Sequence, residues 1–313
     1  MPRLFKKTIL TLGLALSISL LAGCNGARSV AWEARDKSST GFLIKSLKFE
    51  NSDQTYALFV PHSYSPTKKY PVIVFLHGVG EGGNDAKGPL HVGLAPFVFD
   101  QQSTFPFIVI FPQSGGGSWK EDSSSAREVI AVFEQVKKDY SVDDGCVTLT
   151  GLSTGGYGTW AIGATYKQYF SALVPMGSSA NPEKFAPQLT DMPIRSYHNF
   201  GDPFAGEWND SNMAEKVNAL GGKVQYTRTN GGGHDCWSGV YGGTELFDWM
   251  RSQRKRAIAA SPSAPAKSVS AAPVAPAVAP LKTVVAPAAA SVKPAAVPAK
   301  SRSDDQALVP TVY

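Results

Sequence analysis

Two kinds of apolar pattern alternate between about residues 40 and 252. Short runs rich in β-branched and aromatic residues have the length of strands, and segments with apolar residues three or four positions apart have the spacing of helices. The clearest helix is predicted over residues 126–140, where Val129, Phe133 and Val136 fall on one face. The other predicted helices are residues 155–167, 213–220 and 246–251. The predicted strands are residues 42–49, 56–60, 72–76, 107–111, 146–150, 172–176, 194–199 and 224–228.

The order of these elements predicts the fold class. The first strands follow one another, whereas the later strands alternate with helices. Such alternation is typical of an α/β protein with a mostly parallel sheet and helices on both faces. The spacer between strands 172–176 and 194–199 is too short for a large cap domain. We therefore expect one domain over residues 41–252.

Both ends of the chain differ from this domain. Arg3, Lys6 and Lys7 precede an apolar segment, residues 8–21, whose helix would be about 21 Å long, shorter than the ~30 Å core of a membrane. This pattern predicts that residues 1–23 are an export signal peptide. Residues 24–40 are then expected to be a tether. Residues 253–313 are mainly Ala, Pro, Val and Ser without periodicity, which predicts a disordered tail. The tail is either an inert spacer or a basic arm that contacts anionic polymers of the envelope.

The charge distribution argues against a nucleic-acid partner. The chain has 30 Lys and Arg against 25 Asp and Glu, a net charge of +5. Residues 24–250, however, carry 18 basic against 23 acidic residues, so the positive excess lies at the ends. An acidic domain is a poor electrostatic match for a duplex. The composition also excludes a polytopic membrane protein and a disulfide-rich scaffold.

Residues 151–155, Gly-Leu-Ser-Thr-Gly, match the G-x-S-x-G pattern of a serine nucleophile between a strand and a helix. Glycines on both sides of the serine allow close backbone packing, which exposes the hydroxyl at the C-terminal edge of the sheet. The first N–H groups of the helix favour negative charge at this point. Ser153 is therefore the predicted nucleophile, and the backbone N–H of Thr154 a predicted oxyanion donor.

A serine nucleophile needs a histidine base that is oriented by an acid, and in this arrangement the chain order is serine, acid, histidine. Two histidines follow Ser153. His198 lies inside an apolar strand and is expected to be a partly buried structural residue. His234 lies in a glycine-rich loop after a strand, where it can reach the serine. His234 is therefore the predicted base.

The acid is expected just past the strand that precedes the last β–α unit. Asp202 follows strand 194–199 directly and is the predicted acid. Glu207 and Asp210 lie in the same loop and remain rivals. Asp191 precedes the strand and would lie at the opposite edge of the sheet.

The loop after strand 72–76 is expected to supply the second oxyanion donor, because it ends at the same edge as the nucleophile. The backbone N–H of Val79 is the predicted donor, and His77 is expected to hold the loop. Trp119 and Trp208 are candidate walls of the substrate pocket, although each could equally be a packing residue.

Five stretches, residues 70–83, 105–113, 150–160, 233–237 and 246–250, resemble the α/β-hydrolase superfamily. They are most similar to small bacterial serine esterases, which are described as esterases, predicted peptidases, or relatives of polyhydroxybutyrate depolymerases and feruloyl esterases. The resemblance implies the α/β-hydrolase fold and hydrolysis of a carboxylic ester through an acyl-enzyme. The alternatives are a serine peptidase of prolyl-oligopeptidase-like type and a non-catalytic envelope binding module.

The expected partner is an ester substrate, either a small molecule or polymer-borne, and the chain is expected to be a monomer. One departure from the family lies near the acid. Relatives have H-G-x-x-D-P and then a Val-Pro pair, whereas residues 198–208 read His-Asn-Phe-Gly-Asp-Pro-Phe-Ala-Gly-Glu-Trp. Asp202 still aligns, but the altered loop implies a different acyl or alcohol pocket.

Residues 21–24, Leu-Ala-Gly-Cys, resemble the bacterial lipobox. The resemblance implies that Cys24 becomes the first residue and carries lipid, which would anchor the protein to the membrane on the envelope side. Asn25 rather than Asp after the cysteine favours outer-membrane sorting if the organism is Gram-negative. The alternative is a soluble secreted protein.

Gly78, Gly80 and Gly83 also satisfy a dinucleotide-binding fingerprint, with Asp100 about 20 residues further on. We reject this interpretation because Gly88-Pro89, Gly93 and Pro96 are expected to prevent a crossover helix. No CxxC, HxxxH or carboxylate cluster indicates a metal, so no cofactor is predicted.

Of the two cysteines outside the lipobox, Cys146 begins the predicted strand that leads to Ser153, and Cys236 lies two residues after His234, at the other edge of the sheet. Because a disulfide needs Cα atoms within about 7 Å, both are expected to be free thiols.

Overall fold

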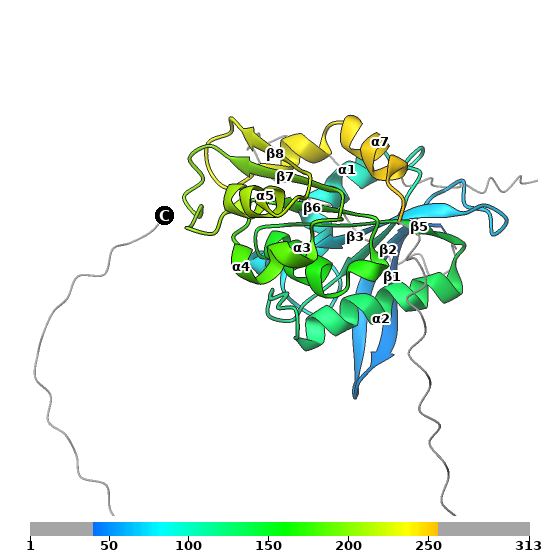
Figure 1. Ribbon diagram of the computed structural model, residues 1–313. Coiled ribbons are helices and arrows are strands. Elements are labelled where there is room, and N and C mark those ends of the chain that lie inside the picture. Colours follow the sequence, from blue (N-terminus) through cyan, green and yellow to red (C-terminus); the bar gives the residue numbers. More distant parts are fainter. Residues whose placement is uncertain (1–39, 256–313) are drawn as a thin grey trace, which may run out of the picture. The chain divides into compact units, whose positions relative to one another are not determined.

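Eight strands form one sheet in the computed structural model, which describes residues 40–255 (Figure 1). The sheet order is β1-β2-β4-β3-β5-β6-β7-β8. The strands are β1 (Gly41–Phe49), β2 (Ser52–Val60), β3 (Tyr70–Leu76), β4 (Ile108–Pro112), β5 (Val142–Leu152), β6 (Ala172–Met176), β7 (Ile194–Asn199) and β8 (Val224–Thr229). The predicted signal peptide with Cys24, nearly all of the tether and the tail from residue 256 lie outside the described residues.

The sheet is antiparallel at one edge and parallel elsewhere. β1 pairs with β2, and β2 with β4, in antiparallel register. From β4 onward through β3, β5, β6, β7 and β8, the strands run parallel to one another. The C-terminal ends of these parallel strands therefore meet at one edge. This confirms the prediction of a mostly parallel sheet that is entered through antiparallel strands.

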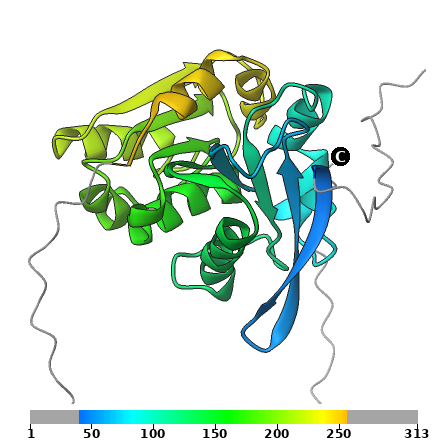
Figure 2. The same ribbon diagram turned by 90° about the vertical axis from the view of Figure 1, so that its right-hand side faces the viewer.

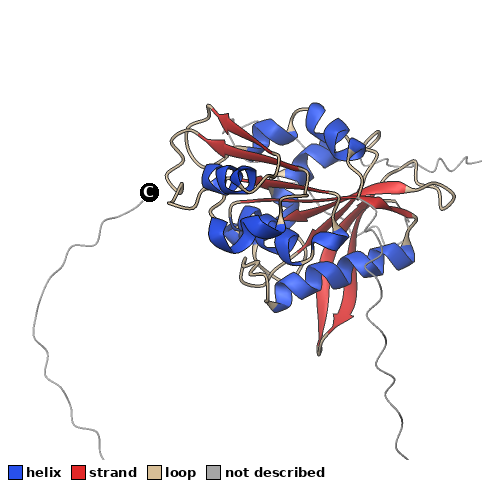
Figure 3. Cartoon of the chain, viewed as in Figure 1, coloured by secondary structure: helices blue, strands red, loops and turns tan. Residues whose placement is uncertain are grey.

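Helices cover both faces of the sheet (Figures 2 and 3). The helices are α1 (Leu94–Asp100), α2 (Ser124–Asp139), α3 (Thr154–Thr165), α4 (Pro182–Phe185), α5 (Asp210–Ala219), α6 (Trp237–Tyr241) and α7 (Glu245–Ser252), with short 3-10 turns η1 (Val79–Glu81), η2 (Gly88–His91), η3 (Lys167–Tyr169) and η4 (Ala186–Gln188). Between β6 and β7 the chain has only α4 and η4, so this segment holds no large cap domain.

The central strands are apolar on both faces because helices pack on each of them. In β3, Val74 and Leu76 belong to the core that is shared with α2, α3 and α5. Ile73 and Phe75, which alternate with them, belong to the core shared with α1, α6 and α7. Side chains of alternate residues point to opposite faces of a strand, so a continuous apolar run fills both cores.

The connection between β3 and β4 corrects one expectation. β3 and β4 are parallel neighbours, and α1 lies between them in the chain, so the crossover helix that we expected to be absent is present. Gly93 takes a φ of 60° just before the helix, and Pro96 lies in its first turn, where its missing N–H would have no helical partner. Ten residues separate Gly83 from Leu94, so the glycine triplet does not open this helix.

None of the helices within residues 40–255 is long and apolar enough to cross a membrane.

Candidate active site

Ser153 lies at the turn between the end of β5 and the start of α3. Its φ of 55° and ψ of −120° lie in a region that a side-chain-bearing residue rarely adopts. The turn is tight because two glycines flank it. A Cβ at Gly155 would overlap the carbonyl oxygen of Leu76, and one at Gly151 would overlap that of Gly155. The G-x-S-x-G spacing therefore has a steric cause in this structure.

Two loops bring a histidine and a carboxylate to this turn. His234, in the loop after β8, places Nε2 2.9 Å from Ser153 Oγ. Its other ring nitrogen, Nδ1, lies 2.8 Å from Oδ2 of Asp202, in the loop after β7. The three side chains lie just past the C-terminal ends of the parallel strands β5, β7 and β8. This edge is where α/β sheets commonly bind ligands. The structure thus brings together the predicted nucleophile, base and acid.

Asp202 is held in place by further contacts. Its Oδ1 accepts a hydrogen bond from the backbone N–H of Phe204 at 2.8 Å, and its side chain is fully buried. Asn199, at the end of β7, donates through Nδ2 to the carbonyl of Gly233 at 3.1 Å, which ties the acid loop to the histidine loop. These contacts fix the relative positions of Asp202 and His234.

The rival acids occupy different positions. Glu207 is exposed. Asp210 is fully buried, but it bonds to His198 rather than to His234, with 2.8 Å between its Oδ2 and His198 Nδ1. Ser178 donates to Asp210 through both its backbone N–H, at 2.7 Å, and its hydroxyl, at 2.6 Å. Trp160 Nε1 donates to Asp210 Oδ1 at 2.7 Å.

His198 is buried, as expected of a strand residue, but it is also in contact with the predicted acid. Its Nε2 lies 3.2 Å from Asp202 Oδ2, an ion-pair distance without the alignment of a hydrogen bond. Burial lowers the pKa of His198, but the hydrogen bond to Asp210 and the charges of Asp210 and Asp202 outweigh it, so the pKa is raised overall. The contact between His198 and Asp210 could not be predicted from the sequence, because nothing in the local pattern pairs residue 198 with residue 210.

His77 holds the loops of the cleft, as expected. Its Nε2 accepts a hydrogen bond from the backbone N–H of Ser114 at 3.0 Å, so Nδ1 carries the proton and donates to the carbonyl of Gly78 at 2.6 Å. Trp119 Nε1 donates to the His77 carbonyl at 2.9 Å. Burial, the larger influence, lowers the pKa of His77 despite the hydrogen bond to Gly78, which favours the neutral ring.

A cleft of about 700 Å³ opens beside Ser153. Val79 and Thr154 line it, next to Ser153 and His234. The other lining residues are Trp119, Tyr157, Phe204, Ser118, Ser178, Ser179 and Lys120, together with Gly116, Gly117 and Gly177. Trp119 thus contributes a wall, whereas Trp208 is not among the lining residues of this cleft.

Phe204 and Tyr157 were not predicted as pocket residues. Phe204 is 69% exposed and its ring meets that of His234 edge-on, with 4.8 Å between the centroids. Tyr157 donates its hydroxyl to Glu121 at 3.0 Å, and Lys184 pairs with the same carboxylate. Proline and glycine residues lie close to Phe204 in the chain and predict a turn there. This turn is the signal in the sequence that indicates an exposed aromatic ring.

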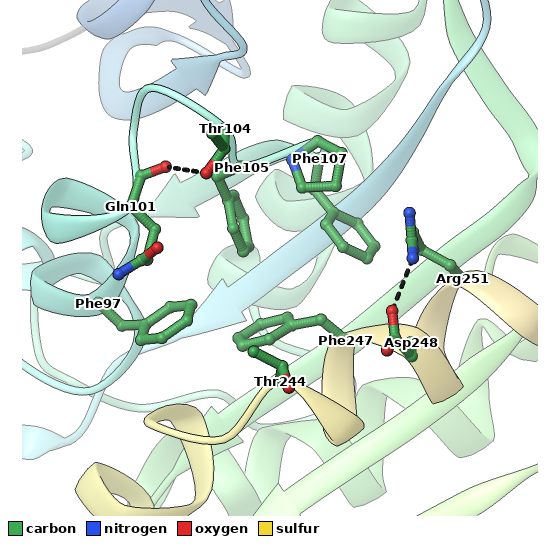
Figure 4. A pocket seen from close by; sticks show the side chains of 10 residues that line it. Phe97, Gln101, Thr104, Phe105, Phe107, Thr244, Phe247, Asp248 and Arg251 are labelled. Carbon is green, nitrogen blue, oxygen red and sulfur yellow. Dashed lines mark hydrogen bonds and ion pairs between the residues drawn. The ribbon is translucent and has the colours of Figure 1, made fainter.

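A second hollow, of about 180 Å³, lies between α1 and α7 (Figure 4). Phe97 and Phe247 stack there with 4.9 Å between ring centroids, and Asp248 pairs with Arg251 at 2.6 Å. None of the predicted catalytic residues lines this hollow.

Both described cysteines, Cys146 and Cys236, are free, as predicted, and both are buried. Among residues 40–255 no group of three or more His, Cys, Asp or Glu side chains is arranged to hold a metal ion.

No protein-family model matches the chain. A bifunctional acetylxylan esterase/xylanase of Neocallimastix patriciarum is 25% identical over 146 residues, which are 45% of this chain and 20% of that protein. Poly(3-hydroxyalkanoate) depolymerase C of Paucimonas lemoignei is 28% identical over 135 residues, or 38% of this chain and 30% of that protein. The chain therefore spans less than a third of the length of either curated relative.

A solved structure described as a thermostable esterase is 28% identical and superimposes with a TM-score of 0.63. The match covers 68% of this chain and 63% of that one. The chain has the α/β-hydrolase fold. Within this fold, Ser153 follows β5, Asp202 follows β7 and His234 follows β8.

Two of these three proteins are named as esterases and the third as a depolymerase. The α/β-hydrolase fold supports many chemistries, so the residues of the site, and not the fold, determine the activity.

Proposed function

We propose that the chain is a serine hydrolase that cleaves carboxylic esters, with Ser153, His234 and Asp202 as its catalytic triad. The observation that carries this proposal is the continuous series of contacts from Ser153 Oγ to His234 and from His234 to Asp202, at 2.9 and 2.8 Å. These distances suit a base that takes the serine proton and an acid that orients the base. The similarity to proteins named as esterases supports ester rather than amide cleavage.

In the first half of the reaction, Ser153 Oγ attacks the ester carbonyl carbon as His234 Nε2 takes the hydroxyl proton. Asp202 stabilises the resulting imidazolium through the Nδ1 contact. The tetrahedral intermediate then expels the alcohol, which receives the proton from His234. An acyl group remains on Ser153. In the second half, His234 activates a water molecule that releases the acid and restores the serine.

The negative charge on the carbonyl oxygen requires donors beside Ser153. We assign this role to the backbone N–H groups of Thr154 and Val79, both of which line the cleft. Thr154 is the first residue of α3, where the N–H has no intrahelical acceptor and the helix dipole favours an anion. Each such donor typically contributes a factor of about 10²–10³ to kcat.

The substrate that best suits this cleft is an ester borne on a polymer or on a bulky group. The cleft opens to solvent past two exposed apolar side chains, Val79 at 66% and Phe204 at 69%. The names of the two curated relatives, an acetylxylan esterase/xylanase and a polyhydroxyalkanoate depolymerase, both refer to polymers.

We also propose that the protein is exported and anchored in the bacterial envelope by lipid on Cys24. The support is the sequence of residues 1–24, with its basic start, apolar stretch and Leu-Ala-Gly-Cys end. Mass spectrometry of the protein from its native membrane, beside Cys24→Ser, tests this. An unmodified Cys24 in the native protein would contradict the anchor.

The test of the activity is a panel of substrates offered to the full chain in detergent, with Ser153→Ala beside it. The panel holds p-nitrophenyl acetate, butyrate and octanoate, methyl ferulate and a peptide anilide. Ester turnover that disappears in Ser153→Ala supports the proposal. Faster cleavage of the anilide than of any ester would indicate a peptidase instead. A folded protein that cleaves nothing on the panel would contradict the esterase assignment and favour a binding module.

A further inference from the structure

The triad aspartate is part of a larger buried group of charges. His198, on β7, lies between two carboxylates, with Nδ1 2.8 Å from Asp210 Oδ2 and Nε2 3.2 Å from Asp202 Oδ2. The Asp202 and Asp210 side chains are fully buried, and that of His198 is only 4% exposed. The same Asp202 oxygen faces His234 Nδ1 at 2.8 Å, so one carboxylate oxygen serves two imidazole rings.

The geometry restricts the charge of His198. Ionised carboxylates only accept hydrogen bonds, and a neutral imidazole donates through one of its two nitrogens. A neutral ring that donated to Asp210 would therefore turn the lone pair of Nε2 toward the Asp202 anion. Only the imidazolium makes both contacts attractive.

Asp210 is arranged as an anion. Its two oxygens face four donors, namely the N–H and hydroxyl of Ser178, the Trp160 indole N–H and His198 Nδ1. A protonated carboxyl would have to donate one hydrogen, but the Ser178 N–H and the Trp160 N–H can only donate. The Ser178 hydroxyl or His198 Nδ1 could accept this hydrogen only by giving up its own donation to Asp210. Two ionised carboxylates buried this close together need a cation between them.

The other titratable groups around this cluster supply no positive charge. Tyr226 on β8 and Cys236 in the loop after β8 both have a raised pKa, chiefly because of burial and then of the charge of Asp210, so both stay neutral at neutral pH. Arg228 on β8 is exposed and stacks on Phe200 at 3.9 Å. His198 is therefore the only buried cation available to the two aspartates among the described residues.

We infer that His198 is a positioning residue of the active site, which as a buried imidazolium between Asp202 and Asp210 keeps Asp202 ionised and turned toward His234. This inference rests on the proposed function, since it assigns His198 a role through the triad. With His198 charged, the three side chains carry a net charge of −1 beside His234. With a neutral residue at position 198 they would carry −2.

This difference predicts a displacement of the pH profile. The acidic limb of kcat/KM reports the protonation of the base in the free enzyme. A more negative cluster makes His234 easier to protonate, so the limb moves to higher pH. In His198→Asn we expect an upward displacement of about one pH unit, since a charge within about 4–6 Å typically has an effect of this size or larger.

The matched variant is the double substitution His198→Asn with Asp210→Asn. It removes the cation together with its second carboxylate and so restores the net charge of −1. We expect its acidic limb to return to the wild-type position. His91→Asn, the same change at an exposed histidine in η2, is the control and should leave the limb in place. An unmoved limb in folded His198→Asn would overturn the inference, because a merely structural histidine would alter stability and not the profile.

A second measurement uses the wild-type chain and needs no variant to be active. Nuclear magnetic resonance of the full chain with ¹⁵N-labelled histidine shows whether each ring nitrogen carries a proton. We expect His198 to carry protons on both nitrogens at pH 7. The His198 signal is assigned as the one that disappears from the spectrum of His198→Asn. If that variant does not fold, each of the other four histidines is replaced by Asn in turn, and the signal that none of these substitutions removes belongs to His198.

The two outcomes separate the two proposals. A neutral His198 at pH 7 in a chain with Ser153-dependent ester turnover overturns this inference and leaves the proposed function intact. A doubly protonated His198 in a chain that hydrolyses no ester supports the charge assignment and contradicts the proposed function.

Discussion

Asp210 Oδ2 lies 2.8 Å from His198 Nδ1, and this contact separates two carboxylates that were rivals for one role. Asp202 and Asp210 both lie in the chain between β7 and the body of α5, and both are buried. Asp202 faces His234, whereas Asp210 faces His198, Ser178 and Trp160. The first contact can orient a base, and the second holds the start of α5 against β7 and α3.

Substitution of Asp202 is therefore expected to affect catalysis, and substitution of Asp210 to affect stability. Asp202→Asn should lower kcat by about 10³–10⁴-fold with a modest change in melting temperature, because the amide cannot stabilise the His234 imidazolium. Asp210→Asn should instead lower the free energy of unfolding by roughly 3 kcal/mol, since its amide N–H₂ would face buried donors. Steady-state kinetics and thermal melts of the same preparations measure both effects. Glu207→Gln, an exposed carboxylate in the same loop, is the control, and a large loss of kcat in it would contradict this assignment.

The backbone of Ser153 leads to a prediction about stability. Its φ of 55° is unfavourable for serine and acceptable for glycine. Ser153→Gly should therefore be more stable than Ser153→Ala by about 1 kcal/mol, although both lack the nucleophile. Urea denaturation of the two variants, side by side, measures the difference. Equal stabilities would mean that the turn holds no strain.

The close packing at Gly155 makes a second steric prediction. An alanine Cβ there would overlap the backbone oxygens of Leu76 and His77, which are not at the ends of flexible side chains. Gly155→Ala should thus destabilise the domain by several kcal/mol and lower activity through displacement of Ser153. Gly239→Ala is the matched control, because a Cβ in that short helix meets nothing within 4 Å. A Gly155→Ala variant with the melting temperature of the wild type would contradict this prediction.

The local features of the sequence were sufficient to predict most of the fold and to select three residues that the structure brings together. The predicted strands 172–176 and 194–199 match β6 and β7 to the residue. β6, which reads Ala-Leu-Val-Pro-Met, is a continuous apolar segment, as is typical of a buried parallel strand. Ser153 was predictable because the glycines that allow its turn are its near neighbours in the chain. His234 could be chosen over His198 because one follows a strand and the other lies within it.

Features that depend on packing were not predictable in this way. Helix α1 was missed because Gly93 and Pro96 look like helix breakers, although both occupy positions at the helix start where they are tolerated. The pairing of His198 with Asp210 depends on where the first residue of α5 lies in space relative to β7. The pattern of residues along the chain does not reveal this distance. The cleft walls contributed by Tyr157 and Phe204 likewise follow from the arrangement of loops in space.

Glu128, on the buried face of α2, predicts a pH dependence of stability that is unrelated to catalysis. Burial, with a smaller contribution from the charge of Glu50, raises the pKa of Glu128 to about 7, and its Oε1 has no hydrogen-bond partner among the described residues. Because the folded state holds this proton more tightly than the unfolded chain, the free energy of unfolding contributed by Glu128 falls as pH rises from about 4.5 through 7. Above that range the buried carboxylate is ionised and the loss is complete.

Glu128→Gln should remove this loss. The variant is expected to match the wild type at pH 4.5 and to exceed it by roughly 1–3 kcal/mol at pH 8, because the amide carries no charge into the core. Urea denaturation at both pH values measures the difference, with Glu134→Gln on the same helix as the control. A Glu128→Gln variant that is less stable than the wild type at pH 8 would mean that the ionised Glu128 finds stabilising partners in the core. In that case the carboxylate would support the packing of α2 instead of opposing it.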